Sequence, residues 1–128
     1  MKRSIAMVLA LLFLVGLVPT LSAQYNRELV VQKMRSNGGL LGQLNAAVGA
    51  GDFYTSALRL TDLAQNFKAL EAIDPPKGSA VEWDRIYSNL IRTAFRGVGA
   101  CGEENLDKLK AEVAAIMALM KEGHTKFR

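Results

Sequence analysis

Apolar residues recur every three or four positions along four segments of the chain, at about residues 27–48, 53–70, 83–98 and 106–127. This spacing is typical of amphipathic α-helices, whereas no stretch shows the sustained alternation expected of a β-strand. Because the connections between the segments are short, the pattern predicts an all-α fold, an antiparallel up-down-up-down four-helix bundle.

The connections carry residues that stop or start helices. The clearest break is the sequence "DPPKGS" (74–79), because two prolines and a glycine cannot continue a helix. Asp52 is a candidate N-cap of the second helix, and Asn105 or an adjacent glutamate opens the fourth. Gly38 and Gly39 weaken the first helix, so we expect a bend there or the close approach of another segment.

Residues 1–23 have the features of a secretory signal peptide. A basic start precedes an apolar run at residues 5–18, and Pro19 and small residues follow, which favours cleavage after Ala23. The run is short for a membrane span, so we expect an exported, periplasmic protein without a membrane segment after cleavage, its bundle formed by residues 24–128. An uncleaved anchor is the alternative interpretation.

Charge and residue types narrow the functional classes. Removing Lys2 and Arg3 with the signal peptide lowers the formal net charge from +4 to +2, and the remaining basic residues are scattered, so nucleic acid is not indicated as a partner. The chain shows no Ser-His-Asp grouping and no phosphate-binding glycine loop after a strand, which argues against an enzyme.

The single cysteine, Cys101, excludes an internal disulfide. We expect it in the loop after the third helix, as a neutral half-buried thiol or an exposed redox thiol.

The only histidine, His124, lies near the end of the fourth helix. It follows Met120 by four residues and Met117 by seven, which places it on the apolar stripe of that helix. In an up-down-up-down bundle, the first helix starts where the fourth ends, so Met34, Trp83 and His124 should share one end. An imidazole facing a thioether between apolar helices would suit haem, because both groups are ordinary axial ligands of haem iron.

A purely structural interpretation fits the same residues. The helix dipole favours a histidine near a helix C-terminus, and methionines fill irregular gaps in hydrophobic cores. A zinc site is disfavoured, because Glu122 and His124 are two residues apart and point to different sides of the helix. Spacing alone leaves the haem and the structural interpretations open.

The C-terminal sequence "ENLDKLKAEVAAIMALMKEGHTKFR" resembles the last helix of the cytochrome c′ family of periplasmic four-helix-bundle cytochromes. That helix ends in a Cys-x-x-Cys-His-x-x-Tyr/Phe-Arg haem-attachment motif, and His124, Phe127 and Arg128 match its histidine, aromatic and arginine positions. Upstream, "LGQLNAAVGAGD" and "PPKGSAVEW" are similar to the end of the family's first helix and to the loop before its tryptophan-bearing third helix. The resemblance covers nearly all of residues 24–128, but only the C-terminal motif is specific.

The motif is degenerate in this chain, because Met120 and Gly123 occupy its two cysteine positions. Neither side chain can form a thioether with a haem vinyl group. Cys101 cannot substitute, since it precedes His124 by about 20 residues, which is roughly 30 Å of helix. Covalent haem attachment by this motif is therefore excluded.

Two interpretations of the resemblance remain open. A soluble periplasmic cytochrome b of the same bundle type ends in a similar His-x-Lys-Tyr-Arg run without cysteines, so the resemblance implies non-covalent binding of b-type haem for electron transfer or small-ligand binding. The implied axial ligands of the iron are His124 and, as a candidate second ligand, Met34. The implied surrounding residues are Met120, Gly123, Phe127, Arg128 and Trp83. Alternatively, haem was lost with the cysteines, and the chain is a haem-free relative that acts as a periplasmic binding or structural module.

The resemblance carries further expectations about the surroundings of the site. Arg128, Lys77 or Arg85 would pair with the haem propionates. A homodimer would form through the first two helices, while no redox partner is identified. An enclosed, empty haem-sized void would cost about 24 cal/mol per Å³, so we expect either a ligand or side chains such as Met120 to fill the space.

Overall fold

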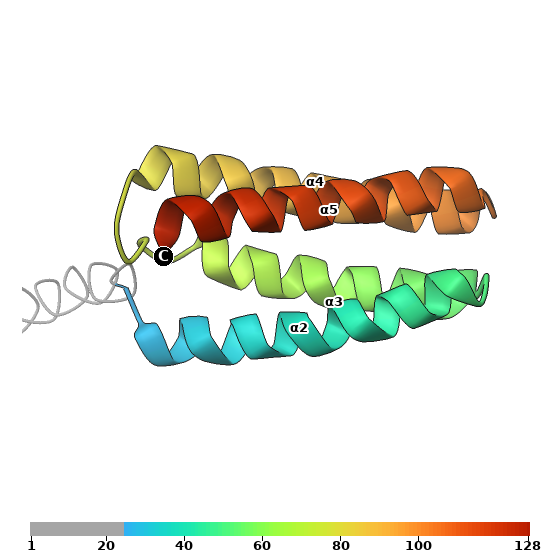
Figure 1. Cartoon of the computed structure of the whole chain (residues 1–128), viewed down its shortest axis with the longest axis horizontal. Coiled ribbons are helices and arrows are strands. Elements are labelled where there is room, and N and C mark those ends of the chain that lie inside the picture. Colours follow the sequence, from blue (N-terminus) through green and yellow to red (C-terminus); the bar gives the residue numbers. More distant parts are fainter. Residues whose placement is uncertain (1–24) are drawn as a thin grey trace, which may run out of the picture.

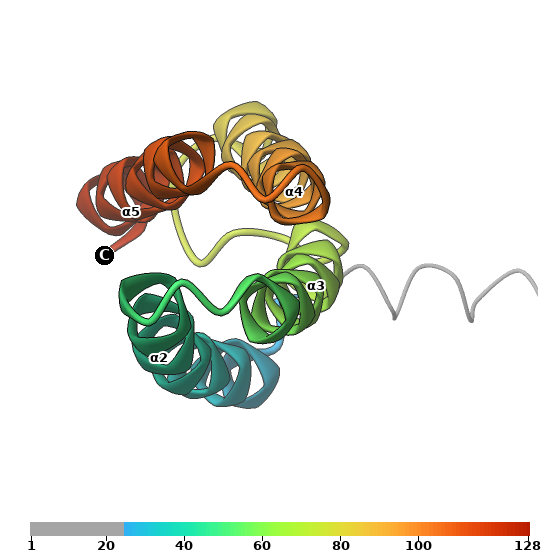
Figure 2. The same cartoon turned by 90° about the vertical axis from the view of Figure 1, so that its right-hand side faces the viewer.

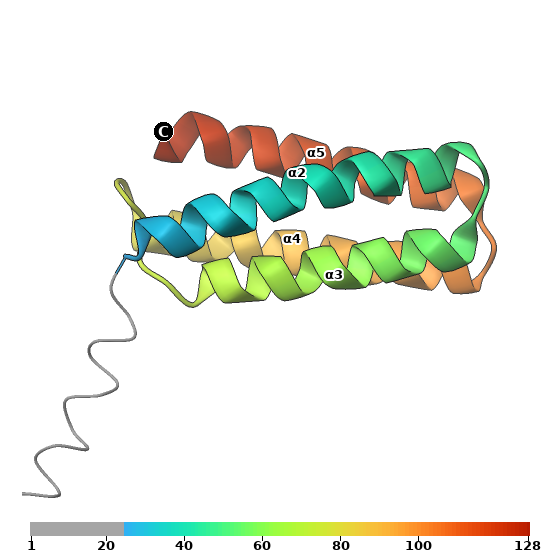
Figure 3. The same cartoon turned by 90° about the horizontal axis from the view of Figure 1, so that it is seen from below.

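The computed structural model describes residues 25–128, which form four α-helices joined by short loops (Figure 1). The helices are α2 (Arg27–Gly49), α3 (Phe53–Glu71), α4 (Ala80–Gly102) and α5 (Leu106–Phe127). Consecutive helices run in opposite directions, which confirms the predicted all-α, up-down-up-down bundle (Figure 3). The predicted signal peptide, residues 1–23, lies outside the described residues. Within 25–128, none of the helices has the length and apolar character needed to cross a membrane.

Each helix begins at a polar N-cap whose side chain accepts a hydrogen bond from the backbone three residues later. This bond satisfies one of the amide groups that a helix start leaves unpaired. The caps are Asn26, Asp52, Ser79 and Asn105. The predictions for Asp52 and Asn105 are confirmed, with bonds of 3.0 Å from the Thr55 amide and 3.1 Å from the Lys108 amide. The predicted break at 74–79 lies in the loop between α3 and α4, as expected.

The hydrophobic core lies between the four helices. Its largest fully buried apolar side chains are Phe67, Leu44, Leu60, Leu63, Leu70, Ile86, Leu90, Leu109 and Ile116. Helices α3 and α4 approach each other closely at Gly97 of α4, where an added Cβ would lie 2.8 Å from Leu60 Cδ1 of α3. Of the two alternatives expected at Gly38 and Gly39, the close approach of another segment is wrong, because a Cβ at either residue would meet nothing within 4 Å. Helix α2 continues through both residues.

Two further expectations are corrected by the structure. Cys101 does not lie in a loop, because α4 continues to Gly102 and leaves the thiol only 5 % exposed. Burial raises the pKa of this thiol, which matches the neutral alternative rather than the exposed redox thiol. The expected position of Met117 on the buried stripe of the fourth helix is also wrong, because Met117 is 46 % exposed. The inward face of α5 is formed by Val113, Ile116 and their neighbours along the helix.

The packing of the bundle is uneven. Helix α2 packs on α3, α3 on α4 and α4 on α5, but α2 and α5 hardly touch each other. Figure 2 looks along the helices and shows α2 and α5 set apart on the side opposite the contact between α3 and α4. The bundle is therefore least tightly packed between its first and last helices.

Candidate functional site: the α2–α5 cavity

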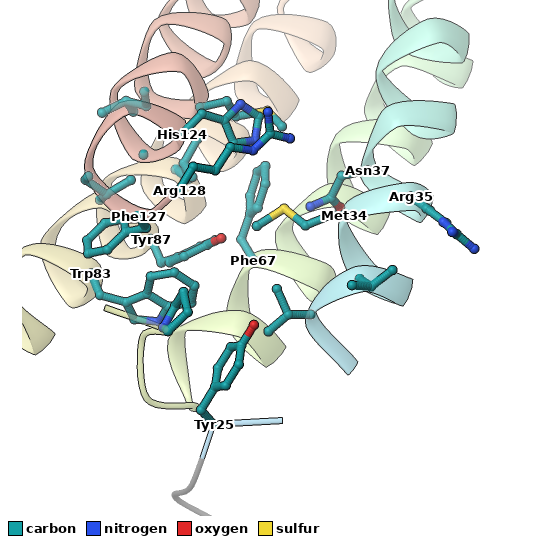
Figure 4. A pocket seen from close by; sticks show the side chains of 18 of the residues that line it. Tyr25, Met34, Arg35, Asn37, Phe67, Trp83, Tyr87, His124, Phe127 and Arg128 are labelled. Atoms are coloured by element: carbon teal, nitrogen blue, oxygen red, sulfur yellow. The ribbon is translucent and has the colours of Figure 1, made fainter. Parts of the chain in front are cut away.

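A cavity of about 720 Å³ lies between α2 and α5, at the end of the bundle where α2 begins and α5 ends (Figure 4). We call it the α2–α5 cavity. Its α2 wall includes Val30, Met34 and Asn37, its α5 wall Leu119, Met120, Gly123, His124 and Phe127, and its floor Phe67, Trp83, Ile86, Tyr87 and Leu90 from α3 and α4. The space is therefore bounded by all four helices and is mostly apolar.

The structure brings together the two predicted iron ligands and the five residues that the resemblance places around them. The cavity-lining residues include His124, Met34, Met120, Gly123, Phe127, Arg128 and Trp83. Figure 4 shows His124 and Arg128 on the α5 side and Met34 on the α2 side, with Phe67 between them deeper in the bundle. The imidazole and the thioether thus face the same space from opposite helices.

Interlocked aromatic rings form the floor of the cavity. Trp83 is 3 % exposed, and its indole N–H donates a hydrogen bond of 2.9 Å to the Leu70 carbonyl at the end of α3. Its ring centroid lies 4.7 Å from that of Tyr87 and 5.0 Å from that of Phe127, in tilted and edge-on arrangements that aromatic pairs favour. Burial raises the pKa of Tyr87, so its hydroxyl stays protonated. These contacts make the floor rigid and uncharged.

His124 is half-buried on the wall of the cavity. Burial lowers the pKa of its imidazole, and the positive charge of Arg128 lowers it further, so the ring is neutral at pH 7. No hydrogen bond joins the ring to another of residues 25–128, although Thr125 and Lys126 beside it both form side-chain bonds. A nitrogen lone pair is therefore available to a group inside the cavity.

The charged side chains at the cavity are all arginines. Arg27, Arg35 and Arg128 line it, and no aspartate or glutamate in the described part of the chain does. Among residues 25–128, none of these three guanidinium groups forms an ion pair. Cationic groups at the edge of an apolar space favour an anionic molecule with an apolar body.

The two other cations predicted near the site do not contribute to it. The Arg85 guanidinium binds the carboxylates of Glu82 and Glu122, and Lys126 joins the same cluster. Neither Arg85 nor Lys77 lines the cavity, so the structure does not support their predicted pairing with haem propionates. Arg128 does line the cavity, in agreement with the prediction.

Sequence reasoning missed Asn37, Phe67 and Tyr87 as site residues. Phe67 and Tyr87 follow the apolar spacing of their helices, so the pattern placed them in the core without distinguishing the core from a cavity wall. Asn37 follows Met34 by three residues, which is the spacing of one helix face, but a polar side chain does not belong to the apolar pattern that marks a buried face. It is 0 % exposed.

Within residues 25–128, no three His, Cys, Asp or Glu side chains cluster closely enough to hold a metal ion. A single imidazole and a thioether are too few ligands for a bare ion, which normally takes four or more. A metal at His124 would therefore need a carrier that supplies most of its ligands.

No protein-family model, curated protein or solved structure matches this chain. The resemblance to the cytochrome c′ family stays a prediction. Any function assigned to the chain depends on the geometry of the α2–α5 cavity.

Proposed function

We propose that the α2–α5 cavity binds haem non-covalently, with His124 as an axial ligand of the iron, for electron transfer or small-ligand binding. The observation that carries this proposal is a cavity of about 720 Å³ with a neutral imidazole and a thioether on facing helices. Cofactor sites are typically about 300–1,000 Å³ and mostly apolar. Met34 is the candidate second axial ligand.

The residues present fit the chemical parts of haem. The porphyrin carries four nitrogen ligands of its own, so one or two axial ligands from the chain complete the coordination of its iron, and iron held in this way supplies reversible one-electron chemistry. The aromatic floor would cover the apolar macrocycle and exclude water from it. Arg27 and Arg128, at the cavity edge, would pair with the two propionates.

Gly123 and Met120, which replace the attachment cysteines, are compatible with a non-covalent site. Gly123 leaves space, because a Cβ there would make only ordinary contact with Ile86 Cγ2, at 3.7 Å. Met120 is half-buried at the wall and leaves the space open. A haem-free relative whose side chains had closed the former site would lack such a cavity, so the open space supports a binding role, such as haem binding, over a purely structural one.

The proposal is tested by producing the full chain in a haem-replete bacterial host. The purified protein should be red with a Soret band, and acidified butanone should extract the pigment and leave a colourless polypeptide. His124→Ala should lose the band. Thr125→Ala is the matched control, because its side chain is exposed and its hydroxyl donates to the Lys121 carbonyl, outside the cavity. A folded, colourless wild-type protein that leaves the spectrum of added haemin unchanged would overturn the proposal.

A further inference from the structure

One polar atom in the wall of the α2–α5 cavity has no hydrogen-bond partner within residues 25–128. Asn37 is 0 % exposed, and its Oδ1 accepts a hydrogen bond of 2.9 Å from Asn66 Nδ2 on α3. Its Nδ2 is buried without a hydrogen-bond partner among the described residues, while Asn37 lines the cavity. A buried donor without a partner is costly, and in native proteins it commonly marks a position where a bound molecule completes the bond.

Lys33 fixes which atom of the Asn37 amide faces the cavity. Lys33 Nζ lies 3.3 Å from Asn66 Oδ1, and an ammonium group can only donate. The oxygen of Asn66 must therefore face Lys33, which turns its Nδ2 toward Ser36 Oγ and Asn37. Asn37 must accept this bond through Oδ1, so the group left for the cavity is the N–H donor.

The donor lies on the wall opposite the histidine. Asn37 follows Met34 by three residues and shares its face of α2. Figure 4 shows the Asn37 amide and the Met34 thioether on the α2 side of the cavity, with His124 on the α5 side. A molecule held by His124 would therefore present its far side to Met34 and Asn37.

We propose that Asn37 is a ligand-binding residue whose Nδ2 donates a hydrogen bond to the terminal acceptor atom of a small ligand, such as a linear anion, on the α2 side of the cavity. This inference rests on the proposed haem function and deepens it. It assigns the site to small-ligand binding, because a site that only transfers electrons through two protein ligands has no use for a free donor beside the thioether.

The test compares azide binding to haemin-loaded protein with and without the donor. Met34→Leu serves as the background, because it removes the competing thioether, and Met34→Leu/Asn37→Leu also removes the donor at nearly constant side-chain size. Dissociation constants come from the Soret shift on titration. Azide keeps a terminal nitrogen that accepts a hydrogen bond, so its affinity should fall about tenfold in the double variant, which corresponds to about 1.4 kcal/mol.

Imidazole is the matched control ligand. Once one ring nitrogen is coordinated, the other carries a proton and cannot accept a hydrogen bond, so its affinity should stay within about twofold. Asn37→Asp provides a second variant that keeps an oxygen for Asn66 and replaces the donor by an acceptor. In the Met34→Leu background it should weaken azide at least as much as leucine does, at pH values where the carboxyl group is ionised.

The outcomes separate this inference from the proposed function. If both variants take up haemin and Met34→Leu/Asn37→Leu binds azide as tightly as Met34→Leu does, the role of Asn37 is overturned and haem binding is left intact. An equal loss of azide and imidazole would also overturn it, because a general disturbance of the cavity would then explain both. Failure of the wild-type protein to take up haemin would overturn both proposals.

Discussion

Gly123 offers a direct test of the α2–α5 cavity, because a side chain placed there should act in opposite directions on stability and on ligand binding. Gly123 lies inside α5, in the wall of the cavity and next to His124. A helix does not favour glycine, so its presence has a cost that alanine would remove. If the cavity is a binding site, this glycine keeps space open at the expense of stability.

The magnitudes follow from the local geometry. Alanine at this position would meet Ile86 Cγ2 at 3.7 Å, an ordinary van der Waals contact, so no strain opposes the gain in helix propensity. Gly123→Ala should therefore raise the free energy of unfolding by about 1 kcal/mol, or the melting temperature by about 4 °C. Gly123→Leu should keep that gain and extend a larger side chain into the cavity. Its haemin affinity should fall at least about tenfold, because overlap with the ligand costs about 1–3 kcal/mol.

The assay pairs urea unfolding of the haem-free protein, followed by circular dichroism, with haemin titration of the wild type and the two variants. Unchanged haemin affinity in Gly123→Leu would show that the space beside Gly123 is not used for binding. A loss of stability in Gly123→Ala would refute the geometry itself, since it would require a contact much closer than the one described.

Three further predictions concern the packing, the helix caps and the cavity floor. In urea unfolding, Gly97→Ala should be less stable than Gly99→Ala by about 1–3 kcal/mol, because only the first places a Cβ 2.8 Å from Leu60 Cδ1; equal stabilities would contradict the close contact of α3 with α4. A backbone hydrogen bond lowers the pKa of Asp52 below its ordinary value of 3.8. The stabilisation that the ionised carboxylate provides is therefore complete above pH 3.8 and is lost as the pH falls through the lower pKa of the folded state. Asp52→Asn, a cap that does not titrate, should lose less stability over the same range, and identical acid unfolding curves would refute this. Trp83 is the only tryptophan and lines the cavity, so bound haemin should quench its fluorescence in proportion to occupancy, whereas full emission at saturation would place haemin elsewhere.

The fold, and the end of the bundle at which the candidate site lies, were predictable because they depend on local signals. Apolar spacing, the "DPPKGS" break and the capping residues determine where the helices begin and end, and short loops leave only an up-down-up-down arrangement. That topology alone brings Met34, Trp83 and His124 to the same end of the bundle, where all three line one cavity.

Other features depend on contacts between helices that no local pattern encodes. The partial separation of α2 from α5, which creates the cavity, is a property of tertiary packing. The burial of Asn37 depends on its partner Asn66, which is 29 residues away in the chain. Cys101 is helical despite the glycines around it, because its side chain packs in the core and this packing outweighs their weak helix propensity.

The most direct test of the central claim is a titration of the haem-free protein with haemin, followed by absorption spectroscopy. We expect a Soret band that shifts and saturates at about one haemin per chain in the wild type and in Thr125→Ala, and no such shift in His124→Ala. A wild-type protein that stays folded while the spectrum remains that of free haemin would contradict the claim that the α2–α5 cavity is a haem site.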